Sequence, residues 1–192
     1  MSKNFKKQVF EIIRTHRKMV TELEESGLER IADIAGAITK AIKKSATVYI
    51  CGNGGSAADA QHIAAELVNR FESSRRAFPA VALTTDSSVI TSVANDFSYD
   101  NVFARQAEAL VKKGDIFWAI STSGSSPNVL AAVKVARKKK AVVLALTGRK
   151  NSRIERLADI CFCADSDSAA RSQEIHMLAY HIICKLVEQS FE

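Results

Sequence analysis

Long apolar runs and prolines are scarce in this sequence of 192 residues. No apolar run approaches the roughly 18 residues needed to cross a bilayer, so we expect no membrane partner. The basic start, MSKNFKKQVFEIIRTHRK, interrupts its apolar residues with charges, which argues against a secretory signal. With two prolines, no low-complexity tract and no internal repeat, the chain is expected to fold as one unit.

Cysteine is also rare, and its four positions show no framework typical of secreted proteins. Cys51, Cys161, Cys163 and Cys184 lie in apolar stretches, so we expect reduced thiols and a cytoplasmic location. A metal site at Cys161 and Cys163 is the less favoured alternative, because Cys-X-Cys within an apolar strand is usually core packing.

The net charge of +6 is spread along the chain, without a basic stripe interleaved with aromatic residues. The basic cluster at 137–140 ends a helical pattern, where cations complement the helix dipole. Nucleic acid is therefore not the expected partner. An anionic metabolite, or no charged partner at all, is compatible with this charge.

Short apolar runs alternate with helical patterns after residue 46. Runs rich in β-branched or aromatic residues predict strands at 47–51, 80–83, 115–120, 141–146 and 159–163. Helical patterns lie between or after these runs, at 56–70, 87–94, 99–112, 126–138, 152–157 and 169–190.

Such an alternation is typical of a parallel sheet covered by helices on both faces. Upstream of it, two amphipathic patterns at 3–26 and 29–44 flank Gly27. We therefore predict one domain over residues 1–192. It combines an N-terminal helical hairpin at 1–45 with a three-layer α/β core, containing a five-stranded parallel sheet, at 46–192.

Two loops are candidate ligand sites because they follow the carboxyl ends of the first and third strands, where such sheets bind ligands. The loop at 121–126 has five hydroxyls in six residues, and Ser126 with Pro127 forms a helix start. This pattern favours phosphate binding over a flexible serine-rich turn. The loop at 52–56, GNGGS, fits neither the dinucleotide nor the nucleoside-triphosphate fingerprint.

A second group of polar residues lies in helical patterns. His62 and Glu66 are four residues apart and share one helix face, although a plain surface pair is the commoner arrangement. The last helix carries Gln173, Glu174, His176 and His181. We expect His176 on the helix surface, and for His181 a hydrogen-bonded core histidine is the alternative to a ligand. If His62, Glu66, Gln173 and His181 meet, they make a reasonable zinc shell, but spacing alone does not establish that they meet.

Five stretches together resemble the phosphoheptose isomerases of the sugar isomerase (SIS) domain family, over nearly the whole chain: CGNGGSAADAQHIAAEL, VANDFSYDNVFARQ, GDIFWAISTSGSSPNVL, ALTG and RSQEIHMLAYH. The resemblance implies a flavodoxin-like fold, a homotetramer and one zinc ion per subunit. It also implies conversion of sedoheptulose 7-phosphate to D-glycero-D-manno-heptose 7-phosphate, the first step toward the heptose of lipopolysaccharide or other surface glycans.

Matched residue by residue, the resemblance implies three roles. The zinc ligands are His62, Glu66, Gln173 and His181, and within this set Glu66 is the catalytic base and His181 the acid. The residues that contact the sugar phosphate are Asn53, Gly54, Gly55, Glu66, Asn95, Asp96, Ser121, Thr122, Ser123, Ser126 and Gln173.

Three questions stay open from the sequence. Gln173 and His181 are about 12 Å apart along a regular helix, so they share a metal only by leaning together, through a helix break or from different subunits. Glu66 would act both as ligand and as base. The rival function is a non-enzymatic adaptor resembling the DnaA initiator-associating protein, which is expected to lack Glu66 and His181.

One expectation concerns assembly. The apolar stripe from Phe5 to Leu23 needs a partner surface, and we predict that it packs between subunits of the homotetramer. The alternative is that this stripe packs on the chain's own sheet.

Overall fold

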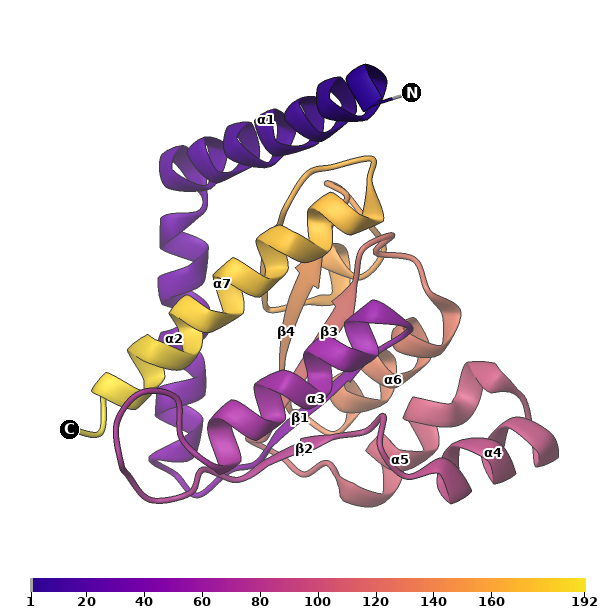
Figure 1. Cartoon of the computed structure of the whole chain (residues 1–192). Helices are drawn as coiled ribbons and strands as arrows, with labels where there is room; N and C mark the ends of the chain where they lie inside the picture. Colours follow the sequence, from indigo (N-terminus) through magenta and orange to yellow (C-terminus); the bar gives the residue numbers. More distant parts are fainter. Residues whose placement is uncertain (1) are drawn as a thin grey trace.

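The computed structural model describes residues 2–192 (Figure 1). Two helices precede the sheet, α1 (Ser2–Ser26) and α2 (Leu28–Ile42). The remaining elements are, in chain order, β1 (Val48–Gly52), α3 (Gly55–Val68), β2 (Ala80–Ala82), α4 (Ser87–Asp96), η1 (Tyr99–Asn101), α5 (Val102–Leu110), β3 (Ile116–Ser121), α6 (Pro127–Lys138), β4 (Val142–Thr147), η2 (Glu155–Leu157), β5 (Ile160–Cys163) and α7 (Ala169–Gln189).

The five strands form one parallel sheet in the order β2-β1-β3-β4-β5, which confirms the predicted flavodoxin-like α/β fold. All residues of β1 and β3 are buried, because helices cover both faces of the sheet. Helices α2, α3 and α7 share one apolar core, and α5 and α6 share the other. The resulting three layers are visible in Figure 1.

The predicted helix at 152–157 is reduced to the single 3₁₀ turn η2. Ser152 and Glu155 do form a helix-start arrangement: Glu155 N–H donates to Ser152 Oγ at 3.3 Å, and Ser152 N–H donates to Glu155 Oε2 at 3.2 Å. The chain enters β5 at Ile160, so only one turn fits before the strand.

The two N-terminal helices meet at a sharp corner at Gly27 and do not lie along each other (Figure 1). A side chain at Gly27 would approach Leu23 O to 2.9 Å, which explains the glycine. Helix α2 buries its apolar stripe against the core, whereas the first half of α1 does not. The exposed apolar residues of α1 are Phe5, Val9, Phe10, Ile12 and Ile13.

The C-terminal half of α1 does reach the core, through the buried Met19 and Leu23 and the partly buried Val20. The alternative was that the stripe packs on the chain's own sheet, and for residues 5–13 this alternative is wrong. None of the helices within residues 2–192 combines the length and apolar character needed to cross a membrane.

Candidate active site

The candidate site lies at the edge of the sheet where β1 and β3 end side by side. Helix α3 leaves the end of β1 toward one face of the sheet, and α6 leaves β3 toward the other face (Figure 1). This reversal is where open α/β sheets bind ligands. It makes neighbours of the loops at 52–56 and 121–126.

The loop after β3, the serine loop (residues 121–126), gathers hydroxyls before the first turn of α6. Ser121 Oγ lies 3.0 Å from Ser126 Oγ and 3.3 Å from Ser123 Oγ. Gly124 has a φ of +60°, a conformation that glycine adopts without strain. The Thr122 carbonyl accepts the Gly148 N–H at 3.0 Å, which holds the loop against the end of β4.

Ser126 is the N-cap residue of α6 and Pro127 follows in the first turn, as predicted. The Ser126 side chain makes no capping hydrogen bond, because it bonds to Ser121 instead. The hydroxyls thus lie at the N-terminal end of α6, where Pro127 has no N–H and the Val129 N–H donates to Asn128 Oδ1 at 2.9 Å. Such a combination suits a phosphate group.

Two amide side chains join the neighbouring loops. Asn53 and Asn128 exchange two hydrogen bonds, both 2.8 Å long, and the Tyr99 hydroxyl donates to Asn53 Oδ1 at 3.2 Å. Asn128 is only 2% exposed, so its amide depends on these partners. Sequence reasoning missed Asn128 and Tyr99. The available signal for Asn128 was a polar residue directly after the helix-starting proline.

Asn95 and Asp96 end α4 and are exposed. Asn95 Nδ2 donates to Asp96 Oδ1 at 2.8 Å, and within residues 2–192 neither side chain bonds to the serine loop. The nearby Tyr99 brings this segment to Asn53. Asn95 and Asp96 thus lie only a few residues before Tyr99, which reaches the site. That either residue contacts the substrate stays a prediction.

Gln173 lies against the first turn of α3. A Cβ at Gly55 would be 2.3 Å from Gln173 Oε1, so only glycine allows this approach. Gln173 Nε2 donates to both carboxylate oxygens of Asp59 at 3.1 Å. Burial raises the pKa of Asp59, an effect that the Gln173 bond and the neighbouring His62 oppose. Gly54, with a φ of +53°, shapes the turn before this helix.

Sequence reasoning missed Asp59, which is 2% exposed. It precedes His62 by three residues and therefore shares a helix face with it, which was the available signal.

Three of the four predicted ligands meet between α3 and α7, which lie side by side (Figure 1). His62 Nε2 is 3.0 Å from Glu66 Oε1. The His181 ring centroid is 5.0 Å from that of His62, and the Phe71 ring lies 5.7 Å from His181. Burial and the neighbouring His62 lower the pKa of His181, whereas Glu66 opposes this shift. All three predicted ligands are partly exposed and accessible to a small molecule.

Tyr180 joins this group from the buried side. Its hydroxyl lies 3.1 Å from His62 Nδ1, and its ring stands edge-on to His181 at a centroid distance of 4.8 Å. Burial and the nearby Asp59 carboxylate raise the pKa of Tyr180, which is 0% exposed. Sequence reasoning missed this residue, because it lies in a strongly apolar stretch of α7.

His176 is not on the helix surface, contrary to the prediction. It is fully buried, its Nε2 lies 2.9 Å from the Thr147 carbonyl oxygen, and burial lowers its pKa to about 4. Because α7 carries apolar residues on several of its faces, the sequence pattern could not show which face meets the sheet. The core-histidine role expected as the alternative for His181 belongs to His176.

The donor atoms of His62 and Glu66 fit a shared metal ion. Their separation of 3.0 Å is close to the ~3.3 Å between two ligands of a tetrahedral zinc ion. Imidazole and carboxylate are ordinary zinc ligands. In the described part of the chain, however, no three His, Cys, Asp or Glu side chains form a ready group of metal ligands.

Gln173 lies at the Asp59 end of the site, away from the His181 end. Helix α7 is continuous from Ala169 to Gln189, which excludes a helix break between Gln173 and His181. The donor chemistry thus fits zinc, and the meeting of all four ligands stays a prediction.

A buried ion pair fixes the loop after α3. Glu188 accepts the three backbone N–H groups of residues 71–73 at 2.7 to 2.9 Å, and Arg75 Nε lies 3.2 Å from its carboxylate. Burial opposes the ionisation of Glu188, but these donors lower its pKa overall. The ion pair thereby holds Phe71 against His181.

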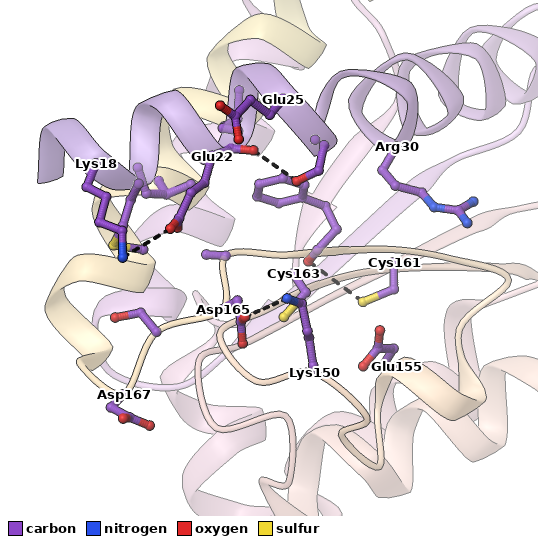
Figure 2. Close-up of a pocket in the computed structure, with 18 of the residues that line it drawn as sticks. Lys18, Glu22, Glu25, Arg30, Lys150, Glu155, Cys161, Cys163, Asp165 and Asp167 are labelled. Carbon is purple, nitrogen blue, oxygen red and sulfur yellow. Dashed lines mark hydrogen bonds and ion pairs between the residues drawn. The ribbon is translucent and has the colours of Figure 1, made fainter. Parts of the chain in front are cut away.

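A cavity of about 870 Å³ lies elsewhere, between the C-terminal half of α1 and the end of β5 (Figure 2). Its lining includes Cys161, Cys163 and the Lys150–Asp165 ion pair of 2.6 Å, but no predicted site residue. Burial raises the pKa of Cys161 to about 12 and also raises that of Cys163. Within residues 2–192, no third His, Cys, Asp or Glu side chain joins Cys161 and Cys163 in a group of metal ligands, so the cysteine metal site gains no support.

Known proteins resemble this chain in sequence and in fold. A family model described as SIS domain matches residues 12–148. The chain is 42% identical, over 100% of both proteins, to a phosphoheptose isomerase of Nitratiruptor. It is 49% identical to that of Thiobacillus denitrificans, over 83% of this chain and 82% of the relative.

A solved structure of a phosphoheptose isomerase from Neisseria gonorrhoeae superposes with a TM-score of 0.91 at 36% identity, covering 96% of this chain and 99% of that one. A Francisella tularensis phosphoheptose isomerase gives a TM-score of 0.92 at 34% identity, covering 95% and 97%. From its sequence, its sheet order and these relatives, the chain belongs to the SIS domain family and, within it, to the phosphoheptose isomerases, which are sugar-phosphate isomerases.

Proposed function

We propose that this enzyme converts sedoheptulose 7-phosphate to D-glycero-D-manno-heptose 7-phosphate and requires zinc. The observations that carry the proposal are the contacts of His62 with Glu66 and His181 between α3 and α7, and the serine loop that follows β3. His62, Glu66, Gln173 and His181 would hold the ion. When bound, zinc would stabilise the negative charge that develops on the substrate oxygens.

The serine loop is proposed to bind the phosphate through its hydroxyls, at the positive N-terminal end of α6. Isomerisation moves a carbonyl between C2 and C1, so one proton must leave C1 and one must reach C2. The Glu66 carboxylate takes the C1 proton and returns it to C2. His181 gives a proton to O2 and receives one from O1, so the proton count balances.

The two roles of Glu66 can be divided between its oxygens. Oε1 contacts His62, whereas Oε2 makes no hydrogen bond within residues 2–192. We assign the ligand role to Oε1 and the proton transfer to Oε2. The adaptor alternative loses its support, because Glu66 and His181 are both present and both lie beside His62, and because the relatives are enzymes.

Three further parts of the proposal concern context. Four free cysteines fit a reducing compartment, so we place the enzyme in the cytoplasm. Its product would supply heptose for lipopolysaccharide or another surface glycan. The exposed apolar half of α1 supports a homotetramer in which this helix packs between subunits.

The activity is tested by incubating the protein with sedoheptulose 7-phosphate and following the aldose product. We expect turnover that falls after chelation and returns with zinc. Absence of product from zinc-loaded protein would contradict the substrate. Full turnover by protein shown by elemental analysis to hold no metal would contradict the zinc requirement.

The assembly is tested separately, by light scattering on a protein beginning at Leu28. Removal of α1 should give a smaller oligomer or aggregation. An intact tetramer without α1 would show that this helix does not hold the subunits together.

A further inference from the structure

Both ring nitrogens of His62 have partners. Nε2 lies 3.0 Å from Glu66 Oε1, and Nδ1 lies 3.1 Å from the Tyr180 hydroxyl. An ionised carboxylate only accepts hydrogen bonds, so Nε2 carries the hydrogen in this arrangement. Nδ1 of the neutral ring is then an acceptor, and the Tyr180 hydroxyl donates to it.

Metal binding requires the opposite tautomer. Nε2 binds a metal through its lone pair, so the single ring proton must lie on Nδ1. Nδ1–H then donates, and the Tyr180 oxygen accepts. The hydroxyl hydrogen then needs another acceptor, and we take the buried Asp59 carboxylate, which lies three residues before His62 on α3, as that acceptor.

A hydroxyl can serve both tautomers, since it donates to one and accepts from the other. A carboxylate or a backbone carbonyl in its place would favour one tautomer only. Gln173 completes the arrangement, because its Nε2 holds both oxygens of Asp59 at 3.1 Å. The observed hydrogen bonds thus join Gln173 to Asp59 and Tyr180 to His62.

We propose that Tyr180 is a positioning residue for the metal site. Its hydroxyl donates to His62 Nδ1 in the metal-free protein and accepts from Nδ1–H when Nε2 binds zinc, with Asp59 as the new acceptor. In the neutral ring, the one proton moves from Nε2 to Nδ1 by exchange with solvent. This inference rests on the proposed zinc site.

Zinc affinity is the first test, measured on zinc-free protein by competition with a chromophoric chelator. Tyr180→Phe keeps the ring and removes only the hydroxyl. We expect it to weaken zinc binding about 10- to 100-fold, as loss of a ligand's hydrogen-bond partner usually does. Tyr49→Phe is the matched control, because it removes a hydroxyl that donates to the Leu110 carbonyl at 3.2 Å, on the other core.

The control should bind zinc as the wild type does, while both variants lose a similar few degrees in Tm. Equal zinc affinity in Tyr180→Phe and wild type would overturn the inference and leave the zinc site standing. A wild type that binds no zinc would overturn the proposed zinc site, and this inference with it.

Nitrogen NMR of the histidine rings tests the tautomer in the wild type alone, and the chain has only four histidines. We expect the His62 proton on Nε2 without zinc and on Nδ1 with zinc. A ring proton that stays on Nε2 in zinc-loaded protein would overturn the inference.

Discussion

The two halves of the site differ in the kind of side chain that they present. The α3–α7 half contains ionisable groups in contact, with His62, Glu66 and His181 at its centre. The serine loop contains hydroxyls, backbone N–H groups and no ionisable side chain. Proton transfer requires groups that change charge, whereas holding a phosphate requires only fixed donors.

This contrast suggests a division of labour, in which one half performs the chemistry and the other binds the substrate. The Asn53–Asn128 amide pair and Tyr99 join the loops of the two halves. Removing a group from either half should therefore change a different kinetic constant, and weakening the amide pair should change both binding and stability.

The largest effect is expected from Glu66→Gln. This change keeps the size of the side chain and removes the basic carboxylate, so kcat should fall about 100-fold or more, with KM little changed. Zinc content must be measured in the same preparation. The exposed Glu29→Gln on α2 is the control. A zinc-loaded Glu66→Gln protein with near wild-type turnover would place the base elsewhere.

A smaller effect is expected from Asn128→Ala, which leaves Asn53 without its amide partner. We expect KM to rise about tenfold and stability to fall by about 2 kcal/mol, about 1 kcal/mol for each of the two hydrogen bonds lost. Asn69→Ala, at an exposed position after α3, is the control. Unchanged KM and unchanged denaturant midpoint would show that the amide pair does not link the two halves.

Ser123→Ala and Ser126→Ala test the binding half. Each removes one hydroxyl from the serine loop, so KM should rise about three- to tenfold while kcat changes little. The exposed Ser88→Ala serves as the comparison. A selective fall in kcat with constant KM would mean that this loop takes part in the chemistry, and the division of labour would be wrong.

The smallest effect concerns the acid sensitivity of the loop that carries Phe71. The pKa of Glu188 is lower in the folded state than its ordinary value of 4.5. Its stabilising contribution is therefore present above about pH 4.5 and is lost as pH falls through the folded-state pKa. Tm measured from pH 7 to pH 3 should show the gap between wild type and Glu188→Gln narrowing in acid. A constant gap would contradict this assignment.

The sequence predicted the five strands to within one or two residues at each end, because short, nearly continuous apolar runs such as those of β1 and β3 are typical of buried parallel strands. It also predicted that the two loops of the site follow the first and third strands, β1 and β3. The η2 segment was less predictable, because its local helix-start signal competes with the nearby entry into β5.

The His62–Glu66 pair and the hydroxyls of the serine loop follow from the sequence by itself, since both depend on spacing within one helix or one loop. Only the tertiary structure decided which residues of α7 face them. It buried His176 beneath Thr147, brought His181 to His62, and placed Gln173 on Asp59. The contacts of His181 and Gln173 join residues more than a hundred positions apart, and the burial of His176 depends on which face of α7 meets the sheet. Local periodicity carries no information about distant contacts or about the choice of face.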